Sequence, residues 1–223
     1  MLTLVIGNKN YSSWSMRPWL AMKVAGIRFE ERVVPLFEEG YKARILAASP
    51  AGKVPALIDG DVQVWESLAI IEHLAERFPE AGLWPADAAA RAQARAISAE
   101  MHAGFQALRN ECPMNMSRPV IRRELSEEAR ANVARIDAIW SGARARFGAG
   151  GPFLFGRFSG ADAMYAPVVS RFLTYAVEVS PAARAYMDAV TALPAFAEWK
   201  AAGIAEPWVI PHDEVDWPQV AKA

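Results

Sequence analysis

A proline that interrupts an apolar segment constrains the fold of this chain more than any other feature. Residues 49–57 read Ser-Pro-Ala-Gly-Lys-Val-Pro-Ala-Leu, and residues 54–58 have the composition of a buried strand. Because proline lacks an N–H, it is normally excluded from the middle of a sheet. A turn proline that enters a strand is one place where a cis peptide bond is used. We therefore predict a cis bond before Pro55, which leaves the backbone N–H and C=O of Val54 free for an extended ligand.

An acidic residue and a hydroxyl residue stand where the next helix is expected to begin. Glu66 and Ser67 precede apolar residues at helical spacing over 68–78. The N-terminus of a helix carries partial positive charge and free N–H groups, which favour a ligand carboxylate. The alternative is an ordinary helix start, since both residue types are common there. Together with the Val54 backbone, this pair predicts a ledge for a peptide-like ligand.

Residues 1–79 alternate between strand and helix patterns. Strands are predicted at residues 3–6, 30–36, 54–58 and 62–64, and helices at 15–24, 41–47 and 66–77. Pro18 fits only the first turn of its helix, and Gly26 ends that helix. Asp59-Gly60-Asp61 indicates a hairpin between the last two strands. The order βαβαββα is typical of a mixed sheet between helices, in an α/β domain.

Two prolines and a glycine then break the pattern, and we place a domain linker at residues 80–87. Beyond it, strand patterns are nearly absent, so residues 88–223 are expected to form an all-α helical bundle domain. Its helices are predicted at residues 88–110, 127–147, 162–177, 182–193 and 195–202. Ser159 and Asp162 form a Ser-x-x-Asp capping box at the third of them. The tail aromatics, Trp208 and Trp217, are expected to pack back onto the body.

Composition narrows the classes of function. The formal net charge is −1 over 223 residues, which gives no electrostatic basis for a nucleic-acid or anionic membrane partner. Cys112 is the single cysteine, so an intrachain disulfide and a cysteine-rich zinc site are excluded. His73 and His102 lack metal-ligand spacing, and we assign no metal. No apolar stretch approaches the ~18 residues of a membrane span, and the N-terminus lacks a basic leader. We expect a cytoplasmic protein.

The proline turn and the Glu66-Ser67 pair resemble the glutathione-binding ledge of the glutathione transferase family. The first matches the family's Val–cis-Pro turn, and the second matches the pair that holds the γ-glutamyl end of glutathione. Residues 12–17, Ser-Ser-Trp-Ser-Met-Arg, resemble the zeta-class Ser-Ser-Cys-x-x-Arg segment, with Trp14 at the cysteine position. Residues 156–162 resemble the family's capping motif. The resemblance covers nearly the whole chain and implies a thioredoxin-like N-terminal domain, an all-α C-terminal domain and a homodimer.

The chemistry that this resemblance implies is activation of a thiol. A free thiol has a pKa of about 8.5, so only a minor fraction is thiolate at neutral pH. A hydroxyl donor and a helix N-terminus stabilise the thiolate. By resemblance, Ser12 is the first candidate donor, Ser13 is its neighbour, and Tyr11 is an alternative because some classes use tyrosine. The competing interpretation is that a serine only caps the helix. For Arg17, one turn further on, we expect a structural role rather than one at the site.

The glutathione site is expected to consist of Lys53, Val54, Pro55, Glu66 and Ser67. Ser67 would bind the γ-glutamyl carboxylate, whereas Lys53 would either contact the glycine carboxylate or be a solvated surface lysine. A second-substrate pocket should lie along the first helix of the helical domain and the loop after it. Its candidates are His102, Phe105, Gln106, Arg109, Met114 and Met116. For most of these, packing in the core is the alternative.

The sequence therefore predicts a detoxifying glutathione transferase, which takes glutathione as co-substrate and adds its thiolate to a small hydrophobic electrophile. One alternative is a noncatalytic family member that acts as an interaction scaffold. Another is a glutathione-dependent isomerase or peroxidase. Trp14 replaces the thiol that supports such chemistry in some relatives, which counts against maleylacetoacetate isomerase activity. A cysteine-based reductase would need a protein thiolate near the first helix, and the sequence has none there.

Overall fold

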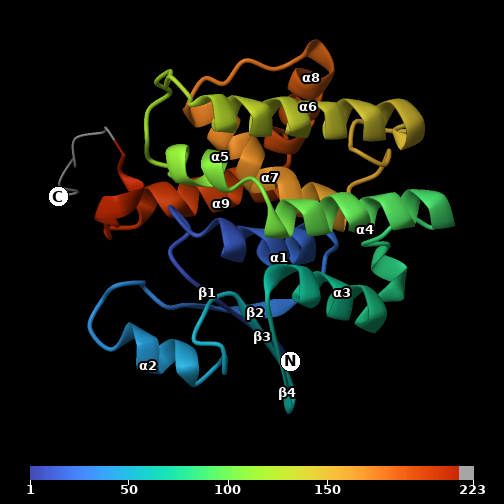
Figure 1. Cartoon of the computed structure of the whole chain (residues 1–223). Coiled ribbons are helices and arrows are strands. Elements are labelled where there is room, and N and C mark those ends of the chain that lie inside the picture. Colours follow the sequence, from blue (N-terminus) through green and yellow to red (C-terminus); the bar gives the residue numbers. More distant parts are fainter. Residues whose placement is uncertain (216–223) are drawn as a thin grey trace.

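The computed structural model describes residues 1–215 (Figure 1). Trp217 lies outside these residues, as does the end of the predicted helical domain, whereas Trp208 is half-buried. The N-terminal half contains β1 (Leu2–Ile6), β2 (Phe29–Val33), β3 (Ala56–Asp59), β4 (Val62–Trp65), α1 (Ser13–Val24), α2 (Tyr41–Leu46) and α3 (Ser67–Arg77). Each predicted strand and helix of this half is therefore present.

The strands form one mixed sheet in the order β2-β1-β3-β4. β1 pairs parallel with β2 and antiparallel with β3, and β3 continues into β4 as an antiparallel hairpin. Because parallel neighbours need a crossover connection, α1 covers one face of the sheet between β1 and β2. This topology confirms the predicted mixed sheet with the element order βαβαββα.

The residues of β1 alternate between two layers of the core. Leu4 and Ile6 belong to the large core that includes Met16 of α1, whereas Val5 packs with Ile45 of α2 on the other side. Figure 1 shows α1 and α3 on one face of the sheet and α2 on the opposite face. All five residues of β1 are buried because both faces of the sheet are covered.

Several boundaries in this half differ from the prediction by one to three residues. β2, predicted at residues 30–36, ends at Val33. α1 begins two residues earlier than predicted, so Pro18 lies in its second turn, and the expectation that it fits only the first turn was wrong. The earlier start makes Trp14 part of the helix. The strand predicted at 54–58 begins only at Ala56, because Pro55 has no N–H to give to the sheet.

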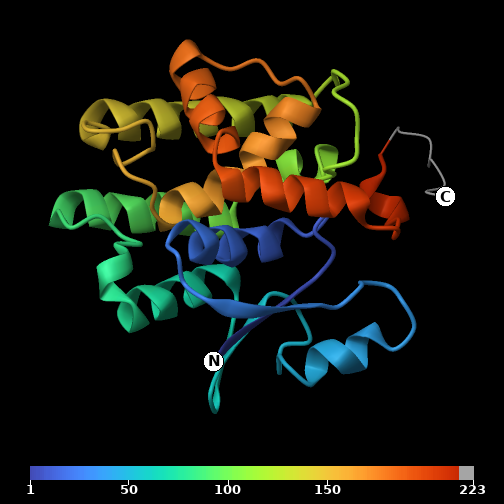
Figure 2. The same ribbon diagram turned by 180° about the vertical axis from the view of Figure 1, so that it is seen from behind.

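The second half is helical, as predicted. It contains α4 (Ala88–Ala103), α5 (Gln106–Glu111), α6 (Glu127–Phe147), α7 (Gly160–Thr174), α8 (Pro181–Thr191) and α9 (Pro194–Ala205), with single 3₁₀ turns at Pro79–Ala81 and Pro211–Asp213. Seen from behind in Figure 2, α9 runs beside α1. No helix in residues 1–215 combines the length and the apolar character that crossing a membrane requires.

The helix predicted over residues 88–110 is in fact two helices. α4 ends before Gly104, and Phe105 has a positive φ of 63°. The Arg109 side chain stabilises this break, because its guanidinium donates to the carbonyls of Met101 and Gly104 at the end of α4. These bonds satisfy carbonyls that have no partner in the helix itself. The break brings Arg109 to the boundary with the N-terminal half.

α7 is the central helix of the helical half and packs against both α1 and α4. Its first turn carries the predicted capping box, in which Ser159 and Asp162 bond reciprocally. Asp162 is fully buried and also accepts the N–H of Leu154 at 3.1 Å. Burial raises the pKa of Asp162 to about 6, against the opposite effect of these hydrogen bonds. The capping box thus fixes where α7 begins, and the packing of α7 against α1 joins the two halves.

Candidate functional site

The loop before α1 is held in place by the helical half. The carboxylate of Glu206 accepts the backbone N–H groups of Lys9 and Asn10, at 2.7 and 3.0 Å. The Asn10 side chain in turn accepts from the N–H of Ser117 at 2.9 Å. Gly203 allows α9 to approach this closely, because a Cβ there would lie 3.0 Å from the Asn10 nitrogen. The residues that follow this loop are therefore fixed by contacts from about 200 residues away in the chain.

Three hydroxyl groups lie where this loop enters α1, and all three make hydrogen bonds within the protein. Ser12 caps α1: its oxygen accepts the N–H of Ser15 at 3.3 Å, and its hydroxyl donates to the Ser15 Oγ at 2.8 Å. Tyr11 donates its hydroxyl to the carboxylate of Glu214. Burial, together with this carboxylate, raises the pKa of Tyr11. The Ser13 Oγ accepts a hydrogen bond from Arg171 at 3.4 Å.

The predicted ledge is present. The Val54–Pro55 peptide bond is cis, which confirms the prediction, and the Val54 backbone makes no hydrogen bond within the described residues. Ser67 begins α3 and is fully buried, and its hydroxyl has no partner in residues 1–215. Glu66, just before it, has a positive φ of 68°. The ledge therefore offers unpaired donors and an unpaired acceptor side by side.

A cavity of about 370 Å³ lies along this ledge. Its walls contain all five residues predicted to bind glutathione, Lys53, Val54, Pro55, Glu66 and Ser67. His102, predicted for the second pocket, instead lines this cavity, with its Nε2 3.5 Å from a Glu66 carboxylate oxygen. Burial lowers the pKa of His102, so the imidazole is neutral at pH 7.

A second cavity of about 410 Å³ adjoins the first, and the two share Trp14, Lys53 and Val54 as walls. The second cavity is lined by Tyr11, Ser12, Ser13, Arg109 and Met114 among the predicted residues. Phe105 and Met116 line neither cavity and are buried in the core, which was the alternative considered for them. Gln106 also lies outside both, and its side chain bonds to Asn110.

Sequence reasoning missed the residues that the helical half adds to this second cavity. They are Pro113, Arg171, Ile210, His212 and Asp213. For Arg171 a signal existed: it is the single charged residue in the second half of α7, whose sequence is mostly apolar. For the tail residues the sequence holds no such signal, because their position depends on the contacts of Glu206 and Glu214.

Three arginines surround Trp14 and Ser13. The Trp14 ring contacts two guanidinium groups, that of Arg17 at 4.2 Å from the ring centroid and that of Arg109 at 4.6 Å. Arg17 is fully buried; its Nε donates to the Met164 carbonyl, and its two terminal nitrogens have no partner in residues 1–215. The bond to α7 supports the structural role that we expected for Arg17.

Two of these arginines, Arg109 and Arg171, line the second cavity and give it a positive wall. Burial lowers the pKa of Arg109 and of Arg171 to about 10 each. The pKa of Arg17 also lies well below its usual value, through complete burial and through the positive charges of the other two. No described carboxylate forms an ion pair with any of the three. The cavity is therefore electrostatically suited to an anion.

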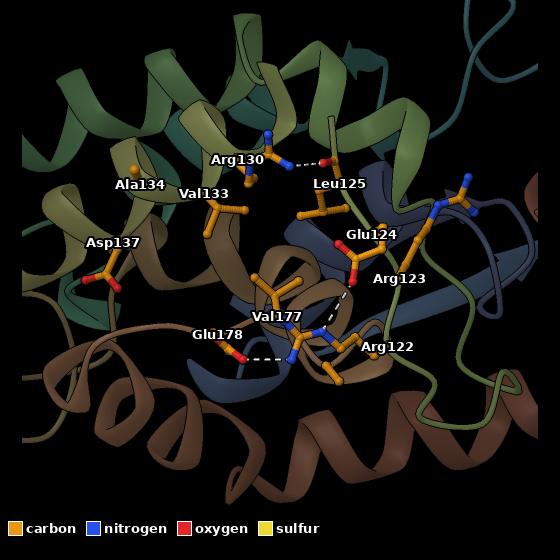
Figure 3. A pocket seen from close by; sticks show the side chains of 11 residues that line it. Arg122, Arg123, Glu124, Leu125, Arg130, Val133, Ala134, Asp137, Val177 and Glu178 are labelled. Atoms are coloured by element: carbon orange, nitrogen blue, oxygen red, sulfur yellow. Dashed lines mark hydrogen bonds and ion pairs between the residues drawn. The ribbon is translucent and has the colours of Figure 1, made fainter. Parts of the chain in front are cut away.

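A further cavity of about 330 Å³ lies between α6 and the end of α7 and contains none of the predicted site residues (Figure 3). Its charged groups already have partners within the protein. Arg122 pairs with Glu178 at 2.8 Å and with Glu124 at 3.7 Å, and Arg130 donates to the Leu125 carbonyl. Within residues 1–215, no group of three His, Cys, Asp or Glu side chains is arranged to hold a metal ion.

Comparison with known proteins places this geometry in a family. A model described as glutathione S-transferase, N-terminal domain, matches residues 8–82. A second, described as glutathione S-transferase, C-terminal domain, matches residues 121–201. Together the two matches span more than half of the chain. They cover both the ledge and the central helix α7.

Individual proteins agree with this. A maleyl pyruvate isomerase structure, described as a bacterial zeta-class glutathione S-transferase, has a TM-score of 0.69 at 26% identity, covering 90% of this chain and 97% of that one. A glutathione transferase homologue from Burkholderia strain BGR1, solved with bound glutathione, has a TM-score of 0.67 at 26% identity, covering 92% and 99%.

A probable maleylacetoacetate isomerase of Caenorhabditis elegans is 43% identical over 99 residues, which is 44% of this chain and 45% of that protein. The chain thus matches about half the length of the curated relatives. The two family models and the agreement in fold over nearly the whole chain lead to one conclusion: this chain is a member of the glutathione S-transferase family, similar to its zeta class.

Proposed function

We propose that this protein is a glutathione transferase that binds glutathione along the ledge of the first cavity and activates its thiol at the second. One observation carries the proposal. The free Val54 backbone, the unpartnered Ser67 hydroxyl and the Glu66 carboxylate line one cavity, and the cavity beside it contains all three candidate hydroxyls. The two adjoining cavities therefore offer groups that are complementary to the polar groups of a γ-glutamyl tripeptide.

The binding roles follow from the chemistry of each group. Ser67 and the N-terminus of α3 suit the γ-glutamyl carboxylate, and Glu66 suits the ammonium group beside it. The Val54 backbone would pair with the cysteinyl unit as a strand does, which directs the thiol towards α1. Lys53 borders both cavities and would meet the glycine carboxylate. The Burkholderia homologue, solved with bound glutathione, supports this choice of ligand.

Activation of the thiol is assigned to the Tyr11–Ser13 group at the start of α1. A hydroxyl that donates to sulfur favours the thiolate, and so does the positive wall of the second cavity. The bond from Tyr11 to Glu214 favours the two serines over the tyrosine. The thiolate would then attack a small electrophile held against Met114 and Pro113. No metal is invoked in this reaction.

A glutathione-dependent isomerase is the second candidate. The Caenorhabditis elegans relative and the zeta-class structure described above are named as isomerases. One observation in this chain favours such a reaction: Arg109 and Arg171 line the second cavity and suit the carboxylate of an unsaturated acid. Trp14, at the position of the zeta-class cysteine, counts against it. A noncatalytic scaffold is a weaker alternative, since a scaffold has no need of an unpaired ledge.

We further propose that the protein works as a homodimer in the cytoplasm. The proposed domains are residues 1–79 for glutathione and 88–223 for the second substrate, joined by a linker at 80–87.

The proposed function is tested by measuring turnover of second substrates with glutathione. The purified protein is mixed with glutathione and, in turn, with an aryl halide, an organic peroxide and a cis-unsaturated keto acid. Loss of free thiol with the aryl halide supports transfer, and isomerisation of the keto acid without thiol loss supports the second candidate. Binding of glutathione with no turnover of any probe would favour the scaffold.

A further inference from the structure

The solvent side of the second cavity is closed by two loops that come from different halves of the chain. Phe37, from the loop between β2 and α2, and His212, from the segment after α9, both line this cavity. Their rings meet edge to face, with the ring centroids 5.2 Å apart. Figures 1 and 2 both show the loop before α2 and the end of α9 on the same side of the molecule. This ring pair therefore joins the two halves at the mouth of the cavity.

The segment that carries His212 is anchored on either side of that residue. Before it, the buried carboxylate of Glu206 accepts two backbone N–H groups of the loop that precedes α1. After it, the buried carboxylate of Glu214 accepts the Tyr11 hydroxyl. We call residues 207–213, between these anchors, the strap. The His212 side chain is 63% exposed, so it can move away from Phe37 while both anchors stay in place.

Phe37 is held in a backbone conformation that its side chain disfavours. Its φ is 67°, in the left-handed region, where a bulky residue is uncommon. Phe37 is also 58% exposed, so burial in the core does not account for this strain. The ring contacts Tyr41, at 5.5 Å between centroids, and His212. Strained residues of this kind concentrate at ligand clamps and switch regions. An exposed ring pair contributes only modestly to stability, so the two rings separate easily.

We propose that Phe37 and His212 form a gate through which the second substrate enters the second cavity and the bulky part of the product leaves it. The gate opens when the strap moves between its anchors and the two rings part. Glutathione is not gated, because the walls of the first cavity contain neither ring. Release of a bulky product is then slower than release of a small one. This inference rests on the proposed function, since it assigns the route into the site proposed there.

The test compares two glutathione conjugates by stopped-flow fluorescence. S-methylglutathione carries a small group on sulfur, whereas S-dinitrophenyl-glutathione carries a ring that must pass the gate. Trp14 borders both cavities, so tryptophan fluorescence reports the binding of either conjugate. In the wild type, the dinitrophenyl conjugate should associate and dissociate more slowly than the methyl conjugate does. No turnover is needed for this measurement.

Phe37→Asn removes the ring and keeps a residue that tolerates a positive φ. Both the association rate and the dissociation rate of the dinitrophenyl conjugate should rise roughly two- to tenfold, the range that loss of one aromatic pair allows. The dissociation constant should change little, because both rates rise together. The rates for the methyl conjugate should stay at their wild-type values.

Three further variants test the pair itself. His212→Ala should match Phe37→Asn, and the double variant should be no faster than either, because each change removes the same contact. Phe37→Tyr retains the ring and should keep the wild-type rates. Phe155→Ala is the matched control: it removes a ring pair with Phe147, at 5.7 Å between centroids, away from the walls of both cavities, and it should also keep the wild-type rates.

The outcomes separate a gate from a binding wall. If dissociation of the dinitrophenyl conjugate becomes faster while its association stays the same, the ring only holds the ligand, and the inference is overturned. Unchanged rates in either single variant overturn it as well, and so do equal association rates of the two conjugates in the wild type. If one variant does not fold, the other decides.

The two conjugates also distinguish this inference from the proposed function. If neither conjugate binds the wild-type protein, the assigned ledge is wrong, and the gate fails with it. If S-methylglutathione binds and the gate variants behave as the wild type does with the dinitrophenyl conjugate, only the gate is refuted.

Discussion

Replacing Ser67 by alanine should weaken glutathione binding and, at the same time, stabilise the empty protein. Ser67 is fully buried, and its hydroxyl has no partner in residues 1–215. A buried polar group left unpaired costs about 1–3 kcal/mol. The alanine variant removes that cost, so the free energy of unfolding of the empty protein should rise by about 1 kcal/mol or more.

The complex should show the opposite effect. There the hydroxyl is expected to donate to the γ-glutamyl carboxylate, and a hydrogen bond to a charged group contributes about 1.5–3 kcal/mol. The dissociation constant for glutathione should therefore rise by roughly 10- to 150-fold. Loss of affinity together with a gain in stability would identify a hydroxyl that the fold keeps unpaired for a ligand.

Calorimetric titration gives the dissociation constant, and urea unfolding without glutathione gives the stability. Ser98→Ala is the matched control, because Ser98 is also fully buried in a helix but already donates to the Ala94 carbonyl at 2.7 Å. The control should bind glutathione normally and gain no stability. Unchanged affinity in Ser67→Ala would refute the assigned role. A less stable empty variant would contradict the claim that the hydroxyl is unpaired.

Other contacts lead to four further predictions. Asp162→Ala should lower the melting temperature, because the N–H groups of Leu154 and Ser159 lose their acceptor; an unchanged melting temperature would contradict this. Since the folded pKa of Asp162 is raised to about 6, its contribution to stability is largest below about pH 4 and falls by about 3 kcal/mol as pH rises through 6. Urea unfolding of Asp162→Asn should lack that slope. His102 is neutral at pH 7, and in acid its imidazolium would compete with the ligand ammonium for Glu66. Glutathione affinity should therefore fall in acid, and fall less in His102→Gln; equal pH profiles by calorimetry would argue against it. Tyr11→Phe should lower stability without raising the thiol pKa of the complex, because Tyr11 is bonded to Glu214; a raised thiol pKa would make Tyr11 the donor.

Local sequence was enough to predict the ledge. The missing N–H of Pro55 and the helix start at Glu66-Ser67 each affect the backbone only within a few residues. The strand after Pro55 and the start of α3 can therefore be predicted from the local sequence. The capping box at Ser159 was predictable for the same reason. The helical periods placed most of the remaining elements within a few residues of their observed ends.

What the sequence did not reveal depends on contacts between distant segments. The break at Gly104 depends on the Arg109 guanidinium, which donates to carbonyls at the end of α4. The spacing of apolar residues in the sequence does not predict such a bond. Arg171 reaches Ser13 across 158 positions of the chain. His102 lies with Glu66 because α4 packs against α3, and a residue's place along one helix does not show which cavity it borders. Contacts between side chains of the two halves could be identified only in the structure.

The most direct test of the account is calorimetric titration of the purified protein with glutathione, with the thiolate absorbance of the same samples read across pH. Saturable binding is expected, with a bound thiol that ionises below the pKa of about 8.5 of the free thiol. The absence of binding would contradict the assigned ledge. Binding with an unshifted thiol pKa would contradict the claim that the start of α1 activates glutathione.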